Sequence, residues 1–100
     1  MNRIVKRAAD AFWVDLDFAT WPLAVGETVV ASNARGAVGV TATDSAGADV
    51  SATMIEGVEA SGTKVKFLIK GGAAGNYVLD VAAPTSDGEM LTGAMVARVI

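Results

Sequence analysis

The amino-acid sequence predicts an all-β protein, an antiparallel β-sandwich of about seven strands. Apolar and polar side chains alternate over short runs, which is the periodicity of strands that bury one face. Turn residues, mainly glycine, aspartate, asparagine and serine, separate these runs at regular spacing. The sequence has no convincing helix, and the Cys–Trp–Cys core pattern of antibody domains is missing. We therefore expect a sandwich that is immunoglobulin-like in architecture only.

The first predicted strand, residues 12–18, has one apolar face and one face that carries Trp13 and two aspartates. Because the aspartates need water, the apolar face should be buried, and Trp13 should be exposed or lie at an interface. In the corner that follows, Pro22 cannot donate to a strand ladder and Gly26 permits a positive φ. The core residues predicted from this region are Phe12, Val14, Leu16, Phe18, Trp21 and Leu23.

The rest of the chain continues the alternation. Further strands are predicted at residues 27–33, 37–43, 64–70, 77–83 and 89–99, with a weaker strand near residues 50–54. Phe67 lies on the apolar side of its strand, opposite lysines that mark the solvent side. Tyr77 begins the apolar face of the next strand. Both aromatic residues are therefore predicted to be in the core.

The stretch KGGAAGNY, residues 70–77, places three glycines within five residues. Such a loop can cradle a phosphate, but this one lacks the Lys-Ser/Thr pair of a P-loop, and a strand rather than a helix follows it. Adjacent glycines also supply the left-handed conformations of a short connection between strands, and asparagine tolerates them. We predict a structural turn made by Gly71, Gly72, Gly75 and Asn76.

Residues 1–10 are predicted to form an N-terminal arm, and residues 11–100 a single sandwich domain. The arm is basic, so it either docks on an acidic neighbour or is a solvated terminus. It also lacks the apolar core of a signal peptide, so we expect synthesis in a cytoplasm without a cleaved export signal. The candidate protein-interface residues are Arg3, Ile4, Lys6 and Arg7 of the arm, together with Trp13.

Composition limits the possible partners. The net charge of −3 argues against nucleic acid, because phosphate binding needs a basic face. No apolar run approaches the roughly 18–20 residues that cross a bilayer, so a membrane is not an expected partner. Hydrophobic residues make up 52% of the chain, and much of this share is alanine and valine. An apolar surface of this kind favours contacts with other protein chains.

Catalytic and metal sites find little support in the sequence. The chain has no cysteine and no histidine, which removes thiol and imidazole chemistry and most zinc and copper sites. Asp15 and Asp17 lie about 7 Å apart on one strand face, but a solvated face explains them better, because a small sandwich without a deep cleft seldom hosts hydrolysis. Asp44, Asp49 and Asp87 do not form an EF-hand pattern. We expect no catalytic residue, no metal, no cofactor and no enzymatic activity.

Exposed aromatic residues offer one more kind of site. Trp13, Trp21 and Tyr77 are the only candidates for a platform that stacks on sugars. Tyr77 follows a turn on the apolar face, so packing explains it better. For Trp13, a protein interface is better supported, because aromatic side chains are favoured interface anchors.

Two stretches together resemble a family of small phage virion proteins, the fiber–tail adaptor or neck-associated proteins. The first is FWVDLDFATWPLAVGETV, residues 12–29, and the second is KGGAAGNYVLDVAAPTSDGEMLT, residues 70–92. The family shows a Trp and Leu corner before Gly-Asp/Glu-Thr, and later Gly-Gly-x-x-Gly-x-Tyr before Thr-x-Asp/Glu-Gly. The matching residues are Trp21, Leu23, Gly26, Glu27, Thr28, Val29, Gly71, Gly72, Gly75, Tyr77, Thr85 and Gly88.

This resemblance implies a non-enzymatic β-sandwich in a symmetric position of the virion, made in the cytoplasm of a bacterial host. The expected function is that of an adaptor that joins the neck or tail to fibers or to neighbouring rings. Its partners would be other phage structural proteins and copies of itself in a ring or lattice. A capsid decoration protein is the alternative within this class, and a carbohydrate-binding module on a surface appendage is the alternative outside it.

Overall fold

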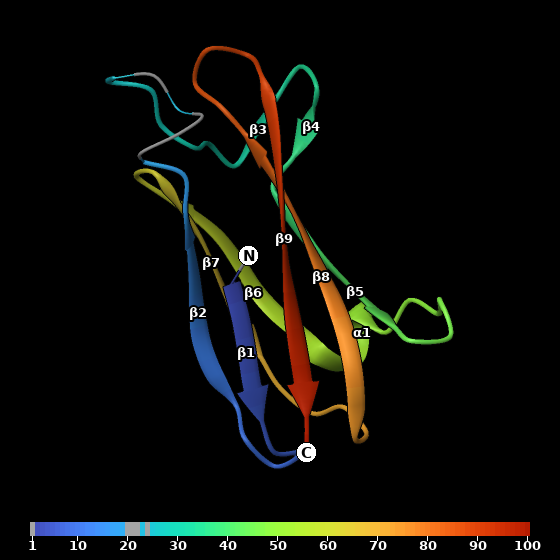
Figure 1. The fold of residues 1–100 in the computed structure, drawn as a ribbon. Helices are drawn as coiled ribbons and strands as arrows, with labels where there is room; N and C mark the ends of the chain where they lie inside the picture. The colour runs from blue at the N-terminus through green and yellow to red at the C-terminus, as the bar shows by residue number, and fades with distance from the viewer. Residues whose placement is uncertain (1, 20–22, 24) are drawn as a thin grey trace.

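The computed structural model describes residues 2–19, 23 and 25–100. Within these ranges the chain forms two main sheets that pack face to face, with a small hairpin at one end (Figure 1). The four-stranded sheet has the order β1 (Asn2–Lys6), β9 (Met90–Val99), β8 (Gly75–Pro84), β5 (Gly39–Asp44). The three-stranded sheet has the order β2 (Phe12–Asp17), β7 (Lys64–Ile69), β6 (Ile55–Ser61). The hairpin pairs β3 (Ser32–Asn33) with β4 (Gly36–Ala37). The predicted all-β sandwich is confirmed.

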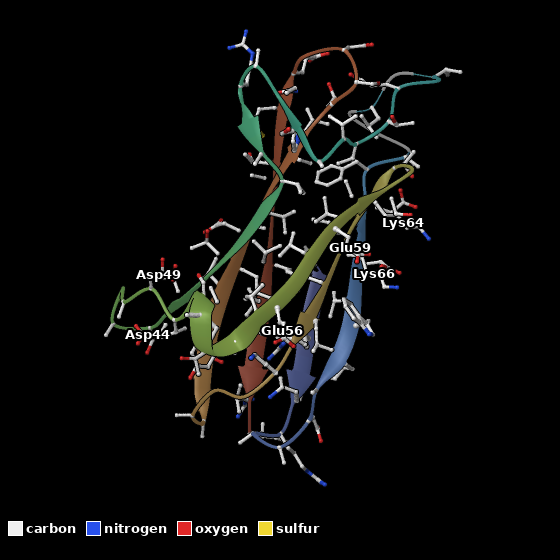
Figure 2. The ribbon with its side chains drawn as sticks, turned by 180° about the vertical axis from the view of Figure 1, so that it is seen from behind. Asp44, Asp49, Glu56, Glu59, Lys64 and Lys66 are labelled. Carbon is white, nitrogen blue, oxygen red and sulfur yellow. The ribbon has the colours of Figure 1, made fainter. Side chains whose placement is uncertain are left out.

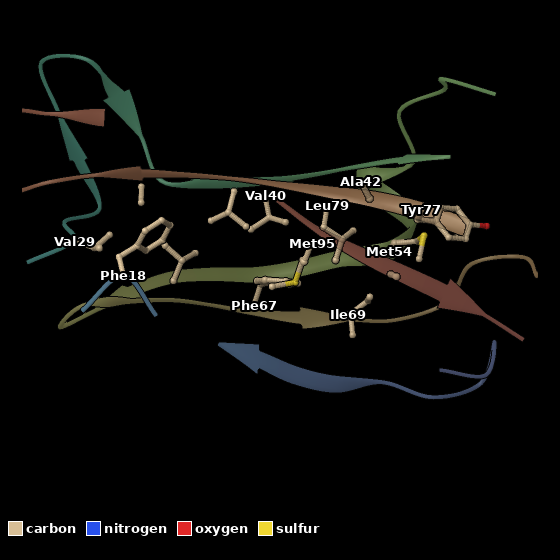
Figure 3. Close-up of a cluster of buried hydrophobic side chains, with 14 of the residues drawn as sticks. Phe18, Val29, Val40, Ala42, Met54, Phe67, Ile69, Tyr77, Leu79 and Met95 are labelled. Carbon is tan, nitrogen blue, oxygen red and sulfur yellow. The ribbon is translucent and has the colours of Figure 1, made fainter. Parts of the chain in front are cut away.

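The core fills the space between the two main sheets, as Figure 3 shows. Alternate residues of β7 and β8 supply much of it, because every second side chain of a strand points to the same face. Phe67 of β7 is fully buried, and Tyr77 of β8 is 7% exposed. Tyr77 lies at one end of the cluster, and Phe18 and Val29 lie at the other.

Phe12 is not a core residue, contrary to the prediction. Its side chain is 37% exposed, because it is the first residue of β2, and β2 is an edge strand. Val14 and Leu16 follow the predicted face and are half-buried against the core. Leu16 reaches across the sandwich, since a Cβ at Gly93 of β9 would lie 2.9 Å from its Cδ2 atom. Trp21, also predicted in the core, lies outside the described residues.

Two other predicted strands differ from the structure. Residues 51–54 form the one-turn helix α1 (Ser51–Met54) rather than a weak strand. The Ser51 hydroxyl oxygen accepts a hydrogen bond from the Ala42 amide, so it takes the place of a strand partner. Of the strand predicted at residues 27–33, only an isolated bridge between Val29 and Thr85 and the two residues of β3 are formed. The strand β6 that follows α1 was not predicted.

The segment KGGAAGN is a crossover between the sheets rather than a tight turn between paired strands. Residues 70–74 leave β7 in one sheet and enter β8 in the other. Gly71 and Gly72 have φ of 58° and 89°, which only glycine adopts without strain. Gly75 and Asn76, predicted as turn residues, are the first residues of β8. A Cβ at Gly72 would lie 2.9 Å from Met54 Cε, so the crossover packs closely on the core.

The N-terminal residues are not an arm, because Asn2–Lys6 forms strand β1, which pairs in parallel with β9. Lys6 is 2% exposed, which corrects its prediction as an interface residue. Its ammonium donates hydrogen bonds to the carbonyl oxygens of Arg7 and Gly71, both at 2.6 Å, and of Ala8 at 3.5 Å. An ammonium can be buried here because it is surrounded by acceptors. β1 is thereby fastened to the crossover.

We expect Tyr77→Ala to lower the free energy of unfolding by about 2–4 kcal/mol, because it leaves a cavity at the end of the core. Tyr77→Phe should cost only about 1 kcal/mol, since it removes the hydrogen bond from the hydroxyl to the Ala73 carbonyl oxygen, 2.6 Å long, and little packing. Urea denaturation of the two variants measures both losses. Equal losses would show that the hydroxyl, rather than the ring, is what matters at this position.

We expect Lys6→Met to lower the free energy of unfolding by about 1–3 kcal/mol at neutral pH, because buried carbonyl oxygens lose their donor. Burial lowers the pKa of Lys6 below its usual 10.5, and nearby Asp10 partly offsets this. The unfolded chain therefore holds this proton to higher pH than the folded chain does. As pH rises from the lowered value towards 10.5, the wild-type protein should gain stability relative to the variant.

Urea denaturation of both proteins across this pH range provides the measurement. A stability difference that stays constant with pH would contradict the burial of a charged Lys6.

Candidate protein-interaction surface

The outer face of the three-stranded sheet carries one large exposed aromatic side chain. Trp13 alternates with the inward residues of β2, and its indole is 51% exposed. Its partner across the strand pair is Leu68 of β7. The Lys66 ammonium lies 4.9 Å from the centroid of the Trp13 ring, which is within the range of a cation–π interaction. The exposed ring is thus held by its neighbours on the same face.

A glycine on β6 makes room for the ring. The pairing of β6 with β7 shifts between Glu56 and Glu59, which marks a β-bulge, and Gly57 there has a φ of 65°. A Cβ at Gly57 would lie 3.0 Å from Trp13 Cη2. The indole therefore crosses over β7 and rests on the bulge of β6. We call the surface formed by Trp13, Gly57, Lys66 and Leu68 the Trp13 surface.

Charged side chains of both signs lie on the same sheet as Trp13, and Figure 2 labels Glu56, Glu59, Lys64 and Lys66 among them. In register across the three strands, Lys66 pairs with Asp15 on one side and with Glu59 on the other. Glu56 Oε1 lies 3.6 Å from the Lys70 ammonium nitrogen. An apolar centre within a polar rim is the usual layout of a protein–protein interface.

Asp17 acts as a structural hydrogen-bond acceptor in this sheet. Its Oδ1 accepts hydrogen bonds from Thr63 Oγ1 and from the Ala19 amide, both at 2.8 Å. The hydrogen bond from Thr63, then that from Ala19, lowers the pKa of Asp17 below its ordinary value. Asp17 thus holds the β6–β7 turn and the end of β2 together, while Asp15 lies beside Lys66.

The predicted interface residues are not all together. Trp13 is on β2, whereas Arg3 and Ile4 are on β1 in the other sheet. Arg3 and Arg7 are exposed, Ile4 packs against the core, and Lys6 is buried.

Of the three aspartates considered for calcium, Asp44 and Asp49 lie in one turn and Asp87 lies apart from them. The side chain of Asp44 accepts from the Ala46 and Ala48 amides, and Asp49 accepts from the Ser51 amide. These bonds shape the turn between β5 and α1. Asp87 instead lies with Glu27 and Glu89, and the three carboxylates can bring one oxygen each to within 4.8 Å of one another. Such acidic groups are common in proteins without a cation, so this cluster is not evidence of a metal site.

The opposite face of the sandwich has a shallow hollow that the sequence did not predict. Its volume is about 390 Å³, and it lies over three neighbouring strands of the four-stranded sheet. Small side chains line it, with one carboxylate among them. The lining residues are Gly39, Thr41, Asp80, Val81, Ala82 and Thr92. Only one signal of it is visible in the sequence, a glycine inside a predicted strand.

Comparisons with known proteins place the chain in a family. No curated protein matches it. In solved structures, CopC from Methylosinus trichosporium OB3b has a similar fold, with a TM-score of 0.66 and 20% identity over 99% of this chain and 84% of CopC. Within the described residues, no helix is long and apolar enough to span a membrane. The model of the family described as podophage GP4 fiber-tail adaptor protein gp77 matches residues 6–98, so the chain belongs to this family of phage fiber-tail adaptors.

Proposed function

We propose that this chain joins the neck or tail of the virion to fibers or to neighbouring rings, and that the Trp13 surface is a protein contact that the chain needs to assemble into the virion. The family supports a structural adaptor role. The observation that carries the choice of surface is the half-exposed Trp13 ring, which is held over the Gly57 bulge and beside Lys66. The proposed partners are other phage structural proteins and copies of this chain in a ring or lattice, met after synthesis in the host cytoplasm.

The geometry of Trp13 suits a binding anchor. Tryptophan is enriched among the few residues that supply most of the energy of an interface. The ring is already fixed by its contacts with Gly57 and Lys66, so binding orders little that was free before. The carboxylates and lysines around it provide a rim that can select the partner by charge.

An adaptor of this kind needs no catalytic chemistry. The Asp17 carboxylate is held by hydrogen bonds that stabilise the fold and lower its pKa. The proposal therefore contains no cofactor, no metal and no reaction. The chain works by binding alone.

Trp13→Ala should reduce incorporation of the chain and of the fibers into phage particles. Truncation of an interface anchor costs at least about 2 kcal/mol, or roughly 30-fold in affinity. Phage carrying the variant gene would be purified, and the chain and fiber proteins counted per particle by quantitative mass spectrometry. Val25→Ala is the matched control, because Val25 is also an exposed apolar residue but is not on the Trp13 surface.

The particle measurements and a glycan array together distinguish the alternative functions. Normal incorporation of Trp13→Ala together with normal fibers would overturn the proposal. A copy number that follows the number of capsid subunits would identify a decoration protein instead. Binding of the wild-type chain, but not of Trp13→Ala, to a glycan array would favour a carbohydrate-binding module.

A further inference from the structure

The hollow on the four-stranded sheet is open because the residue at one point of its lining is a glycine, Gly39 of β5, which has no side chain to fill the space. A Cβ added at Gly39 of β5 would meet no atom within 4 Å, so the space above it is empty. Gly39 does not have a positive φ, so the backbone does not require glycine at this position. Its strand partner is Ala82, which in turn pairs with Thr92. The three small residues in a row form the floor of the hollow.

The hollow and the Trp13 surface are complementary. The Trp13 ring is a flat apolar group that lies over its own sheet and is about half exposed, and a hollow of about 390 Å³ is large enough for an aromatic side chain. The charged group in contact with the Trp13 ring is the Lys66 ammonium, which has Asp15 and Glu59 as its neighbours across the strands. The charged group in the hollow is the exposed Asp80 carboxylate. The indole N–H is a donor that such a carboxylate can also accept.

The two surfaces lie on opposite sides of the molecule. One is the outer face of the three-stranded sheet and the other is the outer face of the four-stranded sheet. They also lie towards opposite ends. Trp13 follows Phe12, which pairs with Ile69, the last residue of β7 before the crossover. Ala82 lies near the end of β8 that is far from the crossover. No copy can therefore use both surfaces in one contact with the same neighbour.

We propose that the partner of the Trp13 surface is the Gly39 hollow of a second copy of this chain. The proposal rests on the proposed function and names the partner of its binding surface. Because the two surfaces differ and face opposite ways, the contact is head-to-tail, and its repetition gives a ring or a filament rather than a two-fold dimer. In each contact the Trp13 ring covers the floor of the hollow, and Lys66 lies near Asp80.

Two variants with complementary defects test this contact. Trp13→Ala removes the ring and keeps the hollow. Gly39→Arg fills the hollow and brings a positive charge near Asp80, and it should not disturb the fold because its site is open. Ser45→Arg, which adds the same charge in the exposed turn after β5, is the matched control. Circular dichroism and thermal unfolding would verify that all four proteins are folded.

Sedimentation velocity of the purified full chains gives the decisive result. The wild-type protein and Ser45→Arg should form oligomers larger than a dimer, and each of the two defective variants alone should be monomeric. An equimolar mixture of Trp13→Ala and Gly39→Arg should form a one-to-one dimer that grows no further, because only one intact pair of surfaces remains. A monomeric mixture, a monomeric wild-type protein, or loss of association in Ser45→Arg would each overturn the proposal.

Particle incorporation separates this inference from the proposed function. Loss of incorporation for both Trp13→Ala and Gly39→Arg supports the contact between copies. Loss for Trp13→Ala with normal incorporation of Gly39→Arg would keep the adaptor function but overturn the self-contact, since Trp13 would then bind a different virion protein. Normal incorporation of both variants would overturn the proposed function, while the sedimentation result would still decide the self-contact.

Discussion

The buried ammonium of Lys6 joins two parts of the chain that are 65 residues apart in the sequence. Its acceptors are backbone carbonyls at the end of β1 and in the crossover from β7 to β8. A buried charge requires such acceptors, so the crossover must keep the Gly71 carbonyl in place. The Tyr77 hydroxyl holds the Ala73 carbonyl of the same crossover. These bonds anchor the crossover to β1 and β8 of the larger sheet at one end of the sandwich.

The outer faces of the sandwich differ because two glycines have different effects. Gly57 has a positive φ and lies so close to Trp13 that a side chain would collide with the ring. It therefore creates a raised aromatic surface on the smaller sheet. Gly39 has neither constraint, and its missing side chain creates a hollow on the larger sheet. The molecule thus has a raised aromatic surface on one outer face and a hollow on the other, so the two faces are not equivalent.

The sequence predicted those features that depend on alternation within one strand. The aspartates beside Trp13 predicted its exposure, and the lysines opposite Phe67 predicted its inward face. Features that depend on distant segments were not predictable. Lys6 resembles a solvated basic residue until the Gly71 carbonyl is placed beside it. Phe12 fits the alternation, but an edge strand leaves its first residue without enough neighbours for burial. The hollow shows the same limit of sequence-based prediction, since small residues on three strands have no common pattern until the sheet places them side by side.

The position of the hollow determines which surfaces an adaptor has left for its other partners. In a head-to-tail ring, neighbouring copies cover both sheet faces of each molecule. Contacts with tail or fiber proteins must then come from the ends of the sandwich, where the β3–β4 hairpin and the crossover lie (Figure 1). At the crossover end, hydrogen bonds from Lys6 and Tyr77 hold the backbone carbonyls of Gly71 and Ala73 in place.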